Sequence, residues 1–113
     1  MLAADPTLIA VNLVLADRAD DFEEWLRTVV VPAVRTHRPE SESRWQVLRS
    51  PVADDGVVPF VFLFTGDDPD DWELEPLLEQ ALGAEGAARA LAAMGDMLTE
   101  DQSGWPVAAV AFP

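Results

Sequence analysis

The stretch Val57–Asp71, VVPFVFLFTGDDPDD, carries the most information about the fold. Residues 58–65 contain no charge and are rich in β-branched and aromatic types, which is the composition of a strand buried on both faces. Side chains alternate along a strand, so one face carries three phenylalanines, Phe60, Phe62 and Phe64, and the other face is almost as apolar. Both sides of the sheet must therefore be covered. Helices can cover one side, and more helices or a second copy of the chain must cover the other.

The composition limits what the protein can be. A chain of 113 residues, half of them apolar, predicts one domain spanning residues 1–113. The absence of cysteine excludes disulfides and thiolate metal sites. The net charge of −14 disfavours nucleic acid and anionic membrane surfaces as partners. The first 20 residues show neither a signal peptide nor a membrane span, so a cytoplasmic location is expected, and the bias towards Ala and Arg suggests a bacterium with a high GC content.

The N-terminal half of the chain predicts a strand, a helix and an edge strand. Residues 8–15, LIAVNLVL, read as a second buried strand. Apolar residues at three- and four-residue steps predict an amphipathic helix that begins with an Asp20–Glu23 capping box, is disturbed at Pro32 and ends near residues 37–39. Residues 44–49, RWQVLR, alternate as in a strand near the sheet edge.

The C-terminal half predicts a hairpin, a broken helix and a last strand. Asp55-Gly56 is a strong hairpin signal before the phenylalanine-rich strand. A helical region is expected to open at residues 67–71, to break near Gly83 and to end at Ser103-Gly104. Residues 105–112, WPVAAVAF, are expected to form the last strand.

This order, strand-helix-strand-strand-helix-strand, predicts an α+β, ferredoxin-like βαββαβ fold. Two right-handed crossovers place both helices on one face of a four-stranded antiparallel sheet, with the first and third strands in the centre. The other face remains apolar, which predicts burial against a second subunit.

The segments FEEWLRTVVVPAV, RWQVLR and VPFVFLFTGDDPD together resemble the dimeric α/β-barrel superfamily, most of all its EthD-like small proteins. The residues that fit the layout are Trp25, Pro32, Arg44, Arg49 and Asp68-Pro69. One departure is that Val30 occupies the position of the family's histidine. The resemblance implies a homodimer whose two sheets close into a barrel, with one pocket per subunit between sheet and helices. Members include cofactor-free monooxygenases, haem-degrading enzymes, lactone isomerases, polyketide cyclases and dehydratases, so the fold does not select a function.

Two residues are candidates for chemistry. His37 is the only histidine, and it is either a general base or haem ligand at a pocket mouth or an exposed residue at a helix end. Asn12 is the single polar residue of strand 8–15, and it either bonds a neighbouring group or orients a ligand carbonyl or enolate.

Aromatic and basic side chains are candidates for ligand binding. Trp25 lies on the apolar stripe of the first helix, where it serves the core or the pocket. Trp45 and Trp105, together with Phe62, could wall a flat aromatic ligand or pack at the subunit contact. Arg44 and Arg49, on opposite faces of strand 44–49, could hold an anionic group or pair with surface acids.

Several kinds of site are not expected. Residues 67–71 contain the DDxxD spacing of magnesium-diphosphate sites, but Pro69 interrupts the helix that such a site needs, so helix capping is the preferred interpretation. No metal is expected. One histidine cannot complete a recognisable Ser-His-Asp set, and no glycine-rich phosphate loop is present.

The sequence thus favours a homodimer that binds a small hydrophobic, aromatic or polyketide-like molecule. Any catalysis would need no cofactor and would be of the monooxygenase, cyclase or dehydratase type. Two alternatives stay open: a non-catalytic binding or scaffold dimer with a pocket filled by side chains, and a haem-handling protein.

Overall fold

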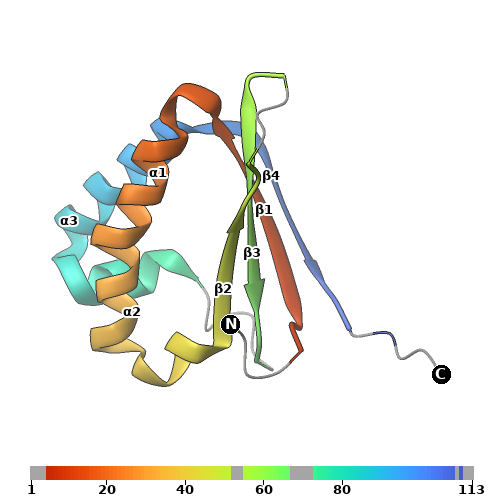
Figure 1. Cartoon of the computed structure of the whole chain (residues 1–113). Coiled ribbons are helices and arrows are strands. Elements are labelled where there is room, and N and C mark those ends of the chain that lie inside the picture. Colours follow the sequence, from red (N-terminus) through yellow and green to blue (C-terminus); the bar gives the residue numbers. More distant parts are fainter. Residues whose placement is uncertain (1–4, 52–54, 67–72, 109, 111–113) are drawn as a thin grey trace.

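A computed structural model describes residues 5–51, 55–66, 73–108 and 110. The sheet is antiparallel and four-stranded in the order β2-β3-β1-β4, and the helices lie on one of its faces (Figure 1). The elements are β1 Leu8–Leu15, η1 Ala16–Arg18, α1 Ala19–Trp25, η2 Leu26–Val30, α2 Val31–His37, η3 Pro39–Arg44, β2 Trp45–Arg49, β3 Val57–Phe64, α3 Leu74–Met97 and β4 Leu98–Pro106. The ferredoxin-like prediction is confirmed. Within the described ranges, no helix is long and apolar enough to cross a membrane.

The two most apolar strands, β1 and β3, form the centre of the sheet, as predicted. Their register pairs Leu8 with Phe64 and Asn12 with Phe60. Because directly opposed residues share a face, the three phenylalanines of β3 all point to the helices. Strand β2 lies at one edge, with Trp45 opposite Phe64 and Arg49 opposite Phe60.

The core lies between this face and the helices. Phe22, Phe60, Leu78 and Val14 are fully buried. The rings of Phe22 and Phe60 meet edge to face with centroids 4.9 Å apart, and Phe22 also stacks on Trp25 at 5.9 Å. Aromatic pairs in this geometry add to the stabilisation from burial itself.

The first helix accommodates Pro32 through a π-helical segment, η2. The amide of Val31 donates to the carbonyl of Leu26, five residues earlier. Proline has no amide proton and crowds the preceding turn, and one wider turn relieves both problems before α2 begins. The helix then runs to His37, close to the predicted end.

The predicted capping box is wrong. The N-cap of α1 is Arg18, without a side-chain cap, and Asp20 lies inside the first turn. There its carboxylate accepts a hydrogen bond from Arg49 on β2 rather than from the helix backbone. A preceding 3-10 turn, η1, continues directly into α1, so the helix starts earlier than the pattern indicates.

Two turns are confirmed by their backbone. Asp55 and Gly56, directly before β3, have positive φ of 50° and 78°, the conformation that the Asp-Gly pair favours in a turn. Gly83, at φ 76° and ψ 169°, breaks α3 where the sequence predicts a break. The predicted opening of this helix at residues 67–71 lies outside the described residues.

The prediction for the last strand is wrong. The helix ends at Met97, and β4 runs from Leu98 to Pro106, whereas residues 105–112 were expected. The strand pairs antiparallel with β1. An edge strand needs backbone partners on one side only, so a polar segment can form it without an apolar pattern. Residues 109 and 111–113 of the expected strand lie outside the described residues.

The face of the sheet opposite the helices has no helical cover in the described chain (Figure 1). The register places apolar side chains from β1 and β3 there in adjacent rows. Leu15, Leu48 and Trp105 are 37%, 44% and 52% exposed. The apolar side chains on the open face are Ile9, Val11, Leu13, Leu15, Leu48, Val57, Pro59, Val61, Leu63 and Trp105.

Candidate functional site

A small apolar cavity of about 90 Å³ lies between the helix-facing side of the sheet and the helices. Strands β2 and β3 supply its aromatic wall, and the helices supply aliphatic side chains. The lining residues are Val30, Val34, Arg38, Ser41, Trp45, Phe62, Phe64, Glu73, Leu74 and Leu77. Its position matches the pocket that the resemblance implies.

The local structure explains why these side chains converge. Trp45, Phe62 and Phe64 alternate onto the helix-facing side of adjacent strands. Val30 ends the π segment and Val34 lies one turn further along, and both are buried. The wide π turn thus brings two aliphatic side chains against the aromatic wall.

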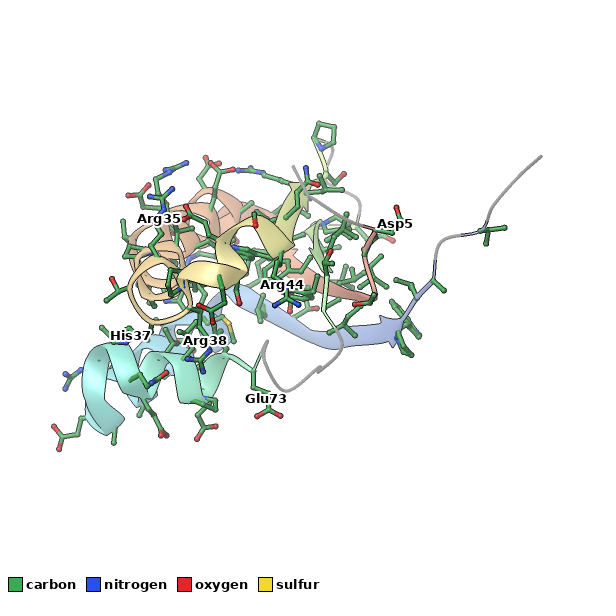
Figure 2. The ribbon with its side chains drawn as sticks, turned by 90° about the horizontal axis from the view of Figure 1, so that it is seen from below. Asp5, Arg35, His37, Arg38, Arg44 and Glu73 are labelled. Carbon is green, nitrogen blue, oxygen red and sulfur yellow. The ribbon has the colours of Figure 1, made fainter. Side chains whose placement is uncertain are left out.

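The polar groups of the cavity come from the chain around η3 and from the start of α3. Ser41 is buried to 4% exposure, and Arg38 is half-buried. Arg38 points towards α3, where Nη1 donates to Oε1 of Gln80 at 2.5 Å, while Glu73 points outward (Figure 2). The polar groups are therefore few and lie along one edge of an otherwise apolar space.

A second hollow, of about 390 Å³, lies between the first helix and the edge strand β2. It is open to solvent and combines an apolar floor with three arginines. Its lining residues are Glu23, Leu26, Arg27, Val31, Arg35, Trp45, Val47, Arg49 and Phe60. We call it the edge groove. Trp45 lines both the cavity and the edge groove and so separates them.

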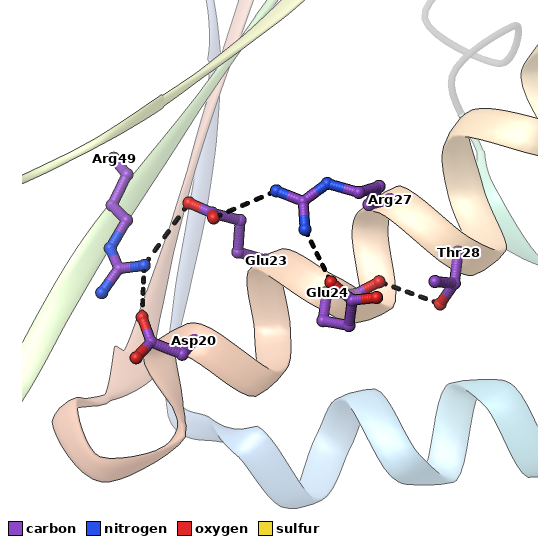
Figure 3. A network of polar contacts seen from close by, with 6 residues as sticks. All are labelled: Asp20, Glu23, Glu24, Arg27, Thr28 and Arg49. Atoms are coloured by element: carbon purple, nitrogen blue, oxygen red, sulfur yellow. Dashed lines mark hydrogen bonds and ion pairs between the residues drawn. The ribbon is translucent and has the colours of Figure 1, made fainter.

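The arginines of the edge groove are neutralised by carboxylates. Nη1 of Arg49 lies 2.8 Å from Asp20 and 3.4 Å from Glu23, and Arg27 bonds Glu23 and Glu24 (Figure 3). The hydrogen bond to Asp20 raises the pKa of Arg49 further, with Glu23 adding to the shift against a smaller effect of burial. Arg35 pairs with Glu42 at 2.6 Å. This network stabilises the surface and leaves no unpaired cation in the groove.

Two of the predicted ligand-binding residues meet in the cavity, Trp45 and Phe62. Trp25 is instead part of the core, 8% exposed and stacked on Phe22. Its buried Nε1 has no hydrogen-bond partner among the described residues. Asn12 faces the helices opposite Phe60, outside the lining of the cavity, and makes no side-chain hydrogen bond to a described residue.

The remaining candidates lie elsewhere. His37 lines a shallow hollow between α2 and α3, away from the aromatic wall. Arg44 ends η3 just before β2, and Trp105 lies on the open face of the sheet opposite Ile9. Arg49 belongs to the edge groove. The structure therefore does not assemble the eight predicted residues into one site.

Sequence reasoning missed Arg38 and Ser41. Their positions depend on η3, a 3-10 turn without a periodic apolar pattern, which carries the chain from the helix end to β2. Pro39, directly after the helix, was the available signal that the backbone turns there. Nothing in the spacing of Arg38 and Ser41 indicated that both face the same cavity.

Val30 lines the cavity and is 4% exposed. Here that position carries no acid or base. Across the described ranges, no group of three or more His, Cys, Asp or Glu residues is placed to hold a metal ion.

Comparison with known proteins supports the fold. The chain is similar to a solved structure from Caulobacter crescentus CB15 that is provisionally named an antibiotic biosynthesis monooxygenase. Identity is 21%, the TM-score is 0.53, and the match covers 94% of this chain and 92% of that one. HapK from Hahella chejuensis is also similar, at 16% identity and TM-score 0.52, over 94% and 96% of the two chains. No family model and no curated protein matches the sequence. The EthD-like group is not singled out.

Proposed function

We propose that this protein binds a small hydrophobic, aromatic or polyketide-like compound in the cavity between its sheet and helices, and that it works as a homodimer. The cavity itself is the observation that carries the proposal. Small-molecule sites are concave, mostly apolar and equipped with a few converging polar groups. Trp45, Phe62 and Phe64 with Arg38 and Ser41 fit that composition, in a cavity of about 90 Å³ that is smaller than most such sites.

The fold similarity to a protein named as a monooxygenase favours an enzyme that needs no cofactor, of the oxygenase, cyclase or dehydratase type. The cavity would contribute by positioning the substrate and excluding water. In the described part of the chain, the ionisable residues that line it are Arg38 and Glu73. These side chains support binding rather than a particular reaction, and a non-catalytic binding dimer is the second candidate.

Nothing in the geometry favours a haem-handling role. His37 lies outside the cavity, in the hollow between α2 and α3. The cavity of about 90 Å³ is also smaller than the roughly 150 Å³ of an engineered cavity that holds a single benzene. A porphyrin is several times larger.

The homodimer rests on the open face of the sheet. Adjacent rows of β1 and β3 present only apolar side chains there, of which Leu13 and Pro59 are one opposed pair. A second copy would cover this face without burying a charge from either row. The same face on both subunits is what a two-fold interface requires.

Native mass spectrometry followed by a binding screen with single-ring aromatic compounds tests the proposal. We expect a dimer and saturable binding that Val34→Phe abolishes, because the larger side chain fills the cavity. Val29→Phe is the matched control, since Val29 faces the hollow between α2 and α3. A monomer at micromolar concentration contradicts the dimer, and the absence of saturable binding contradicts the ligand.

A further inference from the structure

The cavity has one polar edge, formed by Arg38 and Ser41. The amide of Ser41 donates to the carbonyl of Arg38 at 2.9 Å, so one turn fixes both residues next to each other. Trp45 and Phe62 line the same cavity from the sheet. A ligand with an apolar ring and one polar substituent matches this division.

The hydroxyl of Ser41 lacks a partner among the described residues, although the residue is 4% exposed. Among the described residues, only Nε1 of Trp25 is both fully buried and unpaired, so the Ser41 oxygen remains accessible for a hydrogen bond. Because Ser41 lines the cavity, a ligand atom in the cavity can supply the missing partner.

Arg38 has unused donors and no described carboxylate partner. A guanidinium has five N–H donors, and the one hydrogen bond found for Arg38 goes to the neutral side chain of Gln80. Arg18, Arg27, Arg35 and Arg49 pair with carboxylates, and of the three arginines without a described carboxylate, Arg38, Arg44 and Arg89, Arg38 borders the cavity. In a chain of net charge −14, a cation that borders a cavity without such a partner is suited to an anion from outside. Glu73 also borders the cavity, but it points outward, where solvent screens it (Figure 2).

The size of the cavity limits the apolar part of the ligand. About 90 Å³ is less than the roughly 150 Å³ of a cavity that encloses benzene. The cavity therefore encloses at most part of one ring, and the rest of the ring and its polar substituent lie at the edge. Fused polycyclic compounds exceed this space.

We propose that the cavity binds a monocyclic aryl carboxylate, with its ring against Trp45 and Phe62 and its carboxylate on the Arg38 guanidinium and the Ser41 hydroxyl. This inference rests on the proposed small-molecule function and narrows its ligand class. A carboxylate has two oxygens, so it can accept from both donors at once. Hydrogen bonds between charged groups are stronger than neutral ones, which gives the anion its advantage.

Isothermal titration calorimetry of the full chain with sodium benzoate and with benzamide, its neutral isostere, tests the proposal at pH 7. We expect benzoate to bind at least about tenfold more tightly. Arg38→Gln should weaken benzoate binding by about tenfold or more and leave benzamide binding nearly unchanged. Ser41→Ala should weaken benzoate binding about threefold to tenfold.

Arg89→Gln is the matched control. It removes the same charge from an exposed position of α3 that does not line the cavity, so the preference for benzoate should persist. If Arg38→Gln fails to fold by circular dichroism, Arg38→Lys takes its place. The lysine keeps the charge, and the preference for benzoate should survive at reduced affinity.

Three outcomes overturn the assignment. Equal binding of benzoate and benzamide by the wild type removes the anion site but leaves the proposed binding function intact. A benzoate affinity that Arg38→Gln, or Arg38→Lys in its place, leaves unchanged puts the anion elsewhere. If neither probe binds and the wider aromatic screen is also negative, the proposed function itself fails.

Discussion

The guanidinium of Arg49 lies 5.6 Å from the centroid of the Phe60 ring, and the two residues oppose each other across the β2–β3 pair. The same guanidinium donates to Asp20 and Glu23 on α1. Arg49 therefore connects the edge strand β2 to the first helix through two ionic contacts and to the neighbouring strand β3 through one aromatic contact. The arrangement gives a charged side chain a structural role in the sheet.

Arg49→Gln should lower the free energy of unfolding by about 1 kcal/mol, because partly exposed ion pairs and cation–π contacts contribute at this level. Urea unfolding at low and high salt measures the effect, which should shrink with salt. Arg18→Gln is the control, since the described ion pair of Arg18 is local, with Asp21 three residues later at the exposed helix start. Equal losses in the two variants would contradict the role of Arg49.

Gly83 and Gly95 offer a matched pair in α3, since neither has an atom within 4 Å of an added Cβ. Gly83 has φ 76°, so Gly83→Ala should destabilise the protein by about 1–2 kcal/mol through backbone strain. Gly95→Ala should stabilise it by about 0.5–1 kcal/mol, because alanine favours the helix and reduces the freedom of the unfolded chain. Thermal unfolding monitored by circular dichroism measures both changes. Shifts of the same sign would contradict the predicted break at Gly83.

Val11 lies near the middle of the open face, opposite Val61 on β3 and Ser103 on β4. Val11→Glu should convert the proposed dimer to a monomer at micromolar concentration, because the dimer would bury two unpaired carboxylates. Sedimentation velocity reports the change. Leu82→Glu, on an exposed position of α3, should leave the dimer intact. A Val11→Glu protein that remains dimeric would mean that another surface forms the interface.

Val30→His places a titratable group in the cavity. Burial among apolar side chains should hold the histidine pKa in the folded state below its unfolded value of about 6.5. The unfolded state then binds more protons between these two pKa values, so the stability of the variant relative to wild type rises with pH across that window. The stability lost by Val30→His relative to wild type is largest at pH values below the folded-state pKa of the histidine.

Urea unfolding at pH values from 5 to 8 measures this difference. Val29→His, beside the more open hollow between α2 and α3, should show a smaller pH dependence. Parallel stability curves for Val30→His and wild type would show that position 30 is solvated rather than enclosed.

The sheet could be predicted because its central strands depend on side-chain burial. The uncharged runs of β1 and β3 can be buried on both faces, so their faces and central positions were correct, and β3 was one residue out of register with the expected 58–65. Strand β4 was misplaced because its pairing depends on backbone hydrogen bonds at an edge, where polar residues are tolerated, while the apolar segment after Trp105 suggested a strand.

The cavity could be predicted only in part, for a related reason. Trp45 and Phe62 alternate onto the helix-facing side and follow from strand geometry. Arg38 and Ser41 reach the cavity through a 3-10 turn whose path is set by tertiary packing, and no periodicity encodes that path. His37 and Asn12 were chosen for their chemistry, and the type of a residue does not show which way its side chain points in the fold.

The π segment has a consequence for how the cavity could change. An α-helix advances by about 100° per residue, so shortening the segment from Leu26 to Val30 by one residue would rotate α2 by roughly that angle about its axis. Val34 would swing away from the aromatic wall, and the entry of the chain into η3 would turn with it. The number of residues in this segment, more than their identity, therefore decides which side of α2 faces the aromatic wall. Deletion of one residue from this segment would change the lining of the pocket and leave the sheet unchanged.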